Sequence, residues 1–152
     1  MKGFDMHVYQ HILCAVDFSS LSEAACQRAL ALAEQSGARL TFLHVVEYFP
    51  GERSNQLIPP EDVDPAAYEA IEERARLAEL AARLACEAAH QQVLISPHSA
   101  WREIVRFAGA TGTDLIVLGS HGFHGVATLL GSSANALANR APCDVLTVRH
   151  RP

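Results

Sequence analysis

Hydrophobic residues dominate five short segments, the first of them a nearly continuous apolar run, and between these segments they recur at the spacing of a helix. The five segments cover residues 11–16, 39–46, 92–96, 114–118 and 144–149. Short runs without alternating polar residues are typical of strands that are buried on both faces of a parallel sheet. The segments between them predict helices over about residues 20–36, 66–90, 99–110 and 132–140. Because strands and helices alternate, we predict an α/β fold with an open five-stranded parallel sheet and helices on both faces.

Residues that prefer helix ends support these boundaries. Ser20 and Glu23 have the spacing of a capping box at the start of the first helix, and Gly37 is expected to end that helix. Pro65 is expected to open the second helix. The segment from Glu47 to Asp64 contains three prolines and neither pattern, so it predicts a long connection that could close over a nearby site.

Length and composition describe a globular protein. A chain of 152 residues predicts a single domain over residues 1–152, and its 49% hydrophobic and 19% charged residues exclude a disordered chain. No hydrophobic run approaches the ~18 residues of a membrane span, and residues 1–7 lack the apolar core of a secretion signal. The four cysteines form no C-x-x-C pair, which indicates reduced thiols, so we expect a cytoplasmic protein without membrane association.

The charges argue against two further classes of function. The net charge is −5 and the basic residues are dispersed, whereas binding of nucleic acid requires a basic face. The single lysine, Lys2, lies close to the N-terminus, so a G-x-x-x-x-G-K-[ST] phosphate loop is absent. A phosphate group would have to be held by main-chain N–H groups, by hydroxyls or by an arginine.

The clearest candidate for a binding site follows the fourth predicted strand. This strand runs into Gly119-Ser-His-Gly122, and Gly131-Ser132-Ser133 precedes the last helix. Glycines allow turns with positive φ and the close approach of a ligand, and a helix start offers unpaired N–H groups. Either serine could cap the helix or donate to a phosphate oxygen. The layout predicts a phosphate-binding loop, and the alternative is an ordinary crossover with glycine turns.

Two further strands are expected to end beside this loop, because parallel strands have their carboxyl ends at the same edge of the sheet. Ligands of open α/β sheets bind beyond that edge. The first strand ends in Ala15-Val16-Asp17, and the second contains Val45. Asp17 could bind a ribose hydroxyl or a Mg²⁺ ion that accompanies phosphates, or it could cap the following helix. Val45 could present main-chain groups to a base, or it could be an ordinary buried valine.

Neither the histidines nor the serines indicate a catalytic centre. His121 and His124 are three residues apart, but no third ligand in a zinc motif accompanies them, so a phosphate contact or loop polarity is favoured. Ser120 does not stand in a G-x-S-x-G motif. We find no set of acid, base and nucleophile that would commit the chain to a reaction.

Taken together, these segments resemble the universal stress protein family in its single-domain bacterial form. The matching segments are His11 to Ser19, Leu43 to Val45, Asp114 to Gly122, Gly131 to Ser133 and Ala141 to Val148. The resemblance implies a Rossmann-like sheet of the adenine nucleotide alpha hydrolase-like class, with strand order 3-2-1-4-5. It also implies a homodimer through the last strand, Val145 to Val148, which would otherwise be an exposed edge.

The resemblance further implies a site for ATP or AMP, with Mg²⁺ accompanying the nucleotide. Family members that bind ATP carry G-x2-G-x9-G-[ST], but only eight residues separate Gly122 from Gly131 here, which shortens the loop by up to roughly 3.5 Å. By this resemblance Asp17 would lie at the ribose and Val45 at the adenine. The full set of expected contacts is Ala15, Val16, Asp17, Val45, Gly119, His121, Gly122, Gly131, Ser132 and Ser133.

The function implied by the resemblance is that of a dimeric stress-response sensor or adaptor that binds an adenine nucleotide. Two alternatives remain open on the sequence. One is a stress dimer that acts through protein contacts without a nucleotide, and the other is a slow ATPase.

Overall fold

The computed structural model describes residues 8–48, 62, 64–121 and 131–149, which form one five-stranded parallel sheet with four helices. The strand order is β3-β2-β1-β4-β5, so the predicted fold class and strand order are confirmed. The elements in chain order are β1 His11–Ala15, α1 Ser20–Ser36, β2 Arg39–Glu47, α2 Pro65–Arg83, β3 His90–Ser96, α3 Ala100–Thr111, β4 Leu115–Gly119, α4 Ser132–Arg140 and β5 Asp144–Val148.

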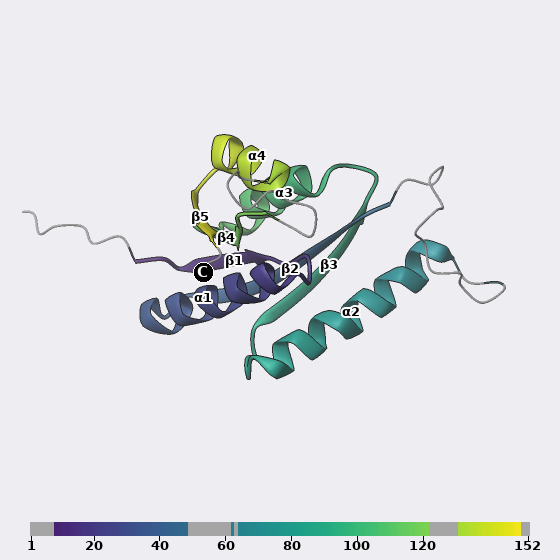
Figure 1. The fold of residues 1–152 in the computed structure, drawn as a ribbon, viewed down its shortest axis with the longest axis horizontal. Coiled ribbons are helices and arrows are strands. Elements are labelled where there is room, and N and C mark those ends of the chain that lie inside the picture. Colours follow the sequence, from purple (N-terminus) through teal and green to yellow (C-terminus); the bar gives the residue numbers. More distant parts are fainter. Residues whose placement is uncertain (1–7, 49–61, 63, 122–130, 150–152) are drawn as a thin grey trace, which may run out of the picture.

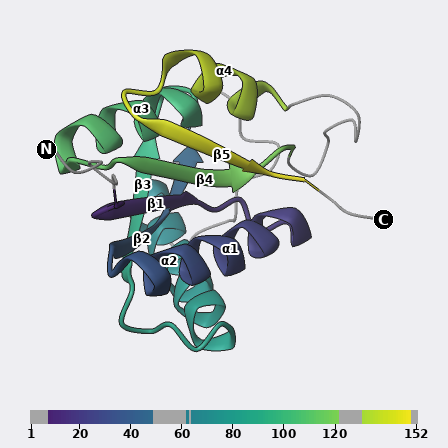
Figure 2. The same ribbon diagram turned by 90° about the vertical axis from the view of Figure 1, so that its left-hand side faces the viewer.

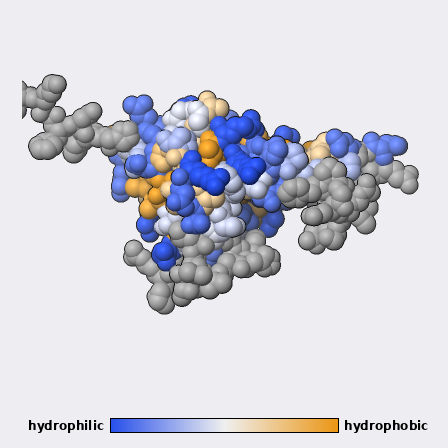
Figure 3. Space-filling model, turned by 90° about the horizontal axis from the view of Figure 1, so that it is seen from above, coloured by the Kyte–Doolittle hydropathy of each residue, from blue (hydrophilic) through white to orange (hydrophobic). Residues whose placement is uncertain are grey.

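The sheet separates two hydrophobic cores. Helices α1 and α2 cover one face and helices α3 and α4 the other (Figures 1 and 2). Alternate strand residues point to opposite faces, so Cys14 and Phe42 contribute to the core under α1 and α2, whereas Leu13 and Leu43 contribute to the other. The outer surface over α3 and α4 is largely hydrophilic (Figure 3). None of the helices in the described part of the chain has the length and apolarity needed to cross a membrane.

The residue that caps the start of α1 is Ser19, one position before the serine expected from the sequence. Ser19 is the N-cap residue, because its backbone is extended and its hydroxyl accepts a hydrogen bond from the N–H of Ser22. The proposed capping box from Ser20 to Glu23 is therefore wrong, since Ser20 is already helical. The predicted end is correct, because Gly37 has a φ of 70°, which few other residues adopt without strain.

Helix α2 is shorter than predicted. It starts at Pro65 as expected but ends at Arg83 instead of near residue 90. The chain leaves the helix through Ala85, which has a φ of 52°, and the N–H of Cys86 closes the turn on the carbonyl of Ala81. The buried side chain of Cys86 fixes this turn, which leaves room for β3 to begin at His90.

The other boundaries agree closely with the sequence. Strands β1, β2 and β5 differ from their predicted limits by one residue at one end. Strand β4 and helix α3 differ by one residue at both ends, and α4 has the predicted limits. Most of the connection between β2 and α2, including the part that could act as a lid, lies outside the described residues.

The cysteines are free thiols, three of them buried. The fold brings two of these distant residues together, because Cys14 Sγ lies 3.5 Å from Cys26 Sγ in the core under α1. The hydrogen bond between them, and then burial, raises the pKa of Cys14 well above its ordinary value. A protonated buried thiol is a poor nucleophile, so these residues act as core side chains.

Glu103 in α3 predicts a measurable pH dependence of stability. Its carboxylate is buried, and it accepts hydrogen bonds from Arg106 Nη2 at 2.5 Å and from Ser96 Oγ at 3.1 Å. The hydrogen bond from Arg106 is the main cause that lowers the pKa of Glu103. Its stabilising contribution is complete above the pKa of an unfolded Glu, about 4.3. It is lost as the pH falls through the lower folded pKa.

We therefore expect Glu103→Gln to lower the free energy of unfolding by about 1–3 kcal/mol near neutral pH. The difference from wild type should shrink in acid below about pH 4, which urea unfolding at both pH values would measure. Glu23→Gln is the matched control, since Glu23 is 38% exposed and pairs with Arg83 at 3.4 Å, and it should cost at most about 0.5 kcal/mol. A cost for Glu103→Gln that is equal at both pH values would contradict this assignment.

Candidate functional site

A cavity of about 540 Å³ lies at the carboxyl ends of β1, β2 and β4, within the size range of small-molecule sites. Here the strand order reverses, because β2 and β4 flank β1 although they are far apart in sequence. Nine of the ten residues expected from the sequence to contact a nucleotide line this cavity. The tenth, Gly122, lies outside the described residues, as does His124.

Helix α4 begins in the wall of this cavity without a side-chain cap. Gly131 is the N-cap residue, and neither Ser132 nor Ser133 caps the first turn, so capping by one of these serines is excluded. At the other three helix starts in the described part of the chain, a main-chain N–H donates a hydrogen bond to a side-chain oxygen. The acceptor is Ser19 for α1, Asp64 for α2 and Glu47 for α3. The first N–H groups of α4 have no partner within the helix and can donate to a ligand.

The glycines serve a different purpose from the one expected. Gly131 has a φ of −62°, and Gly119 is not among the residues with positive φ, so the prediction of left-handed turns at these two positions is wrong. What both positions require is close approach. A Cβ atom on Gly131 would lie 3.1 Å from the Cα of His121, and one on Gly119 would lie 3.1 Å from a side-chain carbon of Leu21. The N–H of Gly131 donates to the carbonyl of Ser120 at 2.6 Å, which holds the start of α4 against the end of β4.

Asp17 lies at the mouth of the cavity, exposed to solvent. Its Oδ1 accepts hydrogen bonds from the main-chain N–H of Ser19 at 2.9 Å and from the Ser19 hydroxyl at 2.5 Å. Asp17 thus supports the capping residue of α1 and does not cap the helix itself. Its Oδ2 has no hydrogen bond to a described residue, so it can accept one from a ligand.

The turn that carries Asp17 is attached to helix α2 by His44. The Nδ1 of His44 lies 2.6 Å from the carbonyl oxygen of Val16 and must donate, because a carbonyl only accepts. The Nε2 of the same ring lies 3.4 Å from Glu73 Oε2 in α2. Phe18, with a φ of 64°, packs its ring 4.6 Å from His44 and under the guanidinium of Arg76. These contacts support the end of β1 beside the cavity, whose lining includes His44.

The sequence analysis missed several residues of the cavity wall. They include Glu47, Ala100 and Ile104, which come from the end of β2 and the start of α3, whereas His44, at the predicted end of the second strand, lines the cavity as expected. The signal that could have found Glu47 is its place as the last residue of a strand that ends at the binding edge. Nothing in the sequence places the first turn of α3 over β2.

The charges of the wall are unusual for a phosphate site. Among the described lining residues there is no Lys or Arg, and the carboxylates are Asp17 and Glu47. The described residues also contain no group of three or more metal-ligating side chains. An anionic ligand would therefore be bound by N–H and hydroxyl donors at the start of α4, where the helix dipole is positive.

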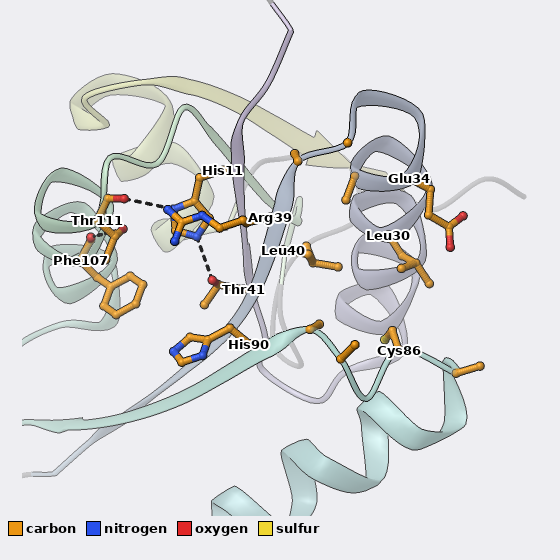
Figure 4. A pocket seen from close by; sticks show the side chains of 16 residues that line it. His11, Leu30, Glu34, Arg39, Leu40, Thr41, Cys86, His90, Phe107 and Thr111 are labelled. Atoms are coloured by element: carbon orange, nitrogen blue, oxygen red, sulfur yellow. Dashed lines mark hydrogen bonds between the residues drawn. The ribbon is translucent and has the colours of Figure 1, made fainter.

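A second cavity, of about 880 Å³, lies at the amino ends of β1, β2 and β3 (Figure 4). The C-terminal ends of α1 and α3 border it, and these ends carry partial negative charge. Its buried His11 has a pKa lowered by burial and lies with Nε2 2.8 Å from Thr41 Oγ1 and Nδ1 3.2 Å from the carbonyl oxygen of Thr111. This cavity is larger and is lined by Arg39, but its described lining includes no helix start that could offer unpaired N–H groups to an anion.

Comparison with known proteins agrees with this geometry. Residues 8–149 match the universal stress protein family. The chain belongs to the universal stress protein family. One relative within the family is universal stress protein A homolog 1 of Coxiella burnetii, which is 36% identical over 145 residues. The alignment spans 94% of this chain and 97% of the relative.

Solved structures of universal stress proteins share the fold. Universal stress protein UspA from Lactobacillus plantarum aligns with a TM-score of 0.67 and 28% identity, over 94% of this chain and 99% of that protein. A universal stress protein in complex with cAMP aligns with a TM-score of 0.68 and 25% identity, over 95% of this chain and all of that protein. A bound adenine nucleotide thus occurs in a protein of this family.

Proposed function

We propose that this universal stress protein binds an adenine nucleotide, ATP or AMP, in the cavity at the carboxyl ends of β1, β2 and β4. The observation that carries the proposal is the uncapped start of α4 in the wall of that cavity. The cAMP complex of a protein with the same fold supports it. A nucleotide phosphate would be bound by the N–H groups and hydroxyls of Ser132 and Ser133.

The two sides of the cavity suit the two ends of a nucleotide. The phosphate side is formed by Gly119, His121 and Gly131, and the opposite side by Val45 with the apolar side chain of Ile104. Asp17 lies at β1 between them, where its unpaired Oδ2 would accept a hydrogen bond from a ribose hydroxyl. With ATP, a Mg²⁺ ion would offset the charge that the wall does not neutralise, because no lysine or arginine lines its described part.

The dimer and the cellular role are part of the same proposal. We propose that two copies pair through β5, since this strand ends the sheet and has one edge without a neighbouring strand among the described residues. Val145 and Leu146 on this strand are only half-buried. The nucleotide-binding dimer would act as a cytoplasmic stress-response sensor or adaptor, not as a fast enzyme.

A thermal shift measurement tests nucleotide binding. AMP or Mg-ATP at about one hundred times its dissociation constant should raise the melting temperature by about 5 °C or more. Adenosine, which lacks the phosphate that α4 would bind, is the control and should give a much smaller shift. Unchanged melting in saturating AMP and Mg-ATP would remove the basis of the proposal and favour a stress dimer that works without a nucleotide.

A further inference from the structure

Strand β2 extends beyond its neighbour β1 at the cavity. Pairing between the two strands ends at Ala15 and Leu43, followed by one hydrogen bond from the N–H of Val16 to the carbonyl of Leu43. Pairing of β2 with β3 continues to Glu47 and Ser96. The main-chain groups of a strand alternate between its two edges, so those of Val45 and Glu47 lie on the edge that β1 no longer covers. This part of β2 therefore faces the cavity with unpaired main-chain groups.

The side chain of Glu47 is held in place at this edge. Its Oε1 accepts a hydrogen bond from the N–H of Ala100 at 2.6 Å, and the N-cap residue Ser99 supplies no side-chain oxygen to this helix. Both Glu47 and Ala100 line the cavity. The second carboxylate oxygen of Glu47 has no hydrogen bond to any described residue. Glu47 is exposed to solvent, and its carboxylate is held in place with one oxygen that can accept a hydrogen bond from a ligand in this cavity, whose described wall has no Lys or Arg.

The position of Glu47 also fixes the direction of the ligand. Glu47 lies on β2 and the start of α4 lies beside the end of β4, and these two strands are separated by β1. Two strand spacings correspond to roughly 10 Å, which matches the length of a mononucleotide from base to phosphate. The carboxylate repels a phosphate group, so the phosphate belongs at α4 and the base at β2.

We propose that Glu47 determines the base specificity of the site by accepting a hydrogen bond from the 6-amino group of a purine. The inference rests on the proposed nucleotide binding. Adenine presents an N–H donor at this position, whereas hypoxanthine and guanine present a carbonyl oxygen that a carboxylate repels. The carboxylate attracts the 6-amino group and repels a 6-oxo oxygen, so Glu47 favours 6-aminopurines over 6-oxopurines.

Calorimetric titration of AMP and IMP tests this role, because AMP has an amino group at position 6, whereas IMP has a carbonyl oxygen there and a proton on the neighbouring N1. The wild type should bind AMP about tenfold or more tightly than IMP. In Glu47→Gln the amide oxygen can still accept from Ala100, which keeps the start of α3 in place. The amide nitrogen can donate to a 6-oxo group, so the preference should fall to about threefold or less, mainly through tighter binding of IMP.

Glu23→Gln is the control, since Glu23 is a carboxylate of α1 outside the cavity, and it should keep the wild-type preference. Normal AMP binding with an unchanged AMP-to-IMP ratio in Glu47→Gln would overturn the role of Glu47 and leave nucleotide binding intact. Absence of binding of both nucleotides to the wild type would overturn the proposed function, and the specificity proposal with it.

Discussion

Replacement of Gly131 by alanine is expected to weaken the binding of AMP by about tenfold or more. The new Cβ atom would lie 3.1 Å from the Cα of His121 and 3.4 Å from the carbonyl oxygen of Ser120. Both are backbone atoms that cannot rotate aside, so the start of α4 has to move away from the end of β4. A charge-assisted hydrogen bond is worth about 1.5–3 kcal/mol, and the loss of one such bond to the phosphate corresponds to at least a tenfold change.

Gly109→Ala is the matched control for this change. Gly109 lies in α3, and a Cβ atom there would meet no other atom within 4 Å. Alanine in a helix is more favourable than glycine by roughly 0.5–1 kcal/mol, so this variant should be slightly more stable and should bind AMP like the wild type. Isothermal titration of both variants measures the comparison. Equal affinities of Gly131→Ala and Gly109→Ala would show that the start of α4 does not hold the phosphate.

Replacement of Phe42 by alanine should have the largest effect on stability. Phe42 is fully buried in the middle of β2, where it pairs with Cys14 of β1 and Gln91 of β3. Its ring belongs to the core under α1 and α2, which also contains Leu77 and Leu80. Removal of a buried aromatic ring leaves a cavity, and the expected loss in the free energy of unfolding is about 3–5 kcal/mol.

Urea unfolding measures this loss, with Ile71→Ala as the control. Ile71 is also a large apolar residue, but it lies on the outer side of α2 with 59% of its surface exposed. Its replacement should change the free energy of unfolding by no more than about 0.5 kcal/mol. If Phe42→Ala is too unstable to measure, Phe42→Leu provides a smaller loss in the same direction. A cost for Phe42→Ala close to that of Ile71→Ala would contradict the core described here.

The sequence predicted the order of elements and the sheet well, because these depend on local patterns. The strands consist mainly of apolar residues, and Gly37 and Pro65 act within one helical turn. The end of α2 could not be predicted in this way. Its alanine-rich sequence continues to favour a helix beyond Arg83, and the turn at Ala85 exists because Cys86 packs into the core.

The candidate site could be predicted only in part, because some of its features are local patterns and others depend on packing between distant segments. The glycines and serines near α4 form a recognisable pattern, but their backbone angles depend on the packing of α4 against β4, so their positive φ was wrongly expected. Ser19 and Ser20 are chemically identical, and only the extended backbone of Ser19 makes it the cap. The place of Glu47 at the end of the second strand was a usable signal, but only the fold shows that β2 extends beyond β1 there.

A crystal structure of the protein with AMP tests the central claim most directly. The account predicts that phosphate oxygens lie about 2.7–3.1 Å from the main-chain nitrogens of Ser132 or Ser133, with the base beside Val45 and Glu47. A phosphate bound away from α4, or N–H groups of its first turn that point away from the cavity, would contradict the account.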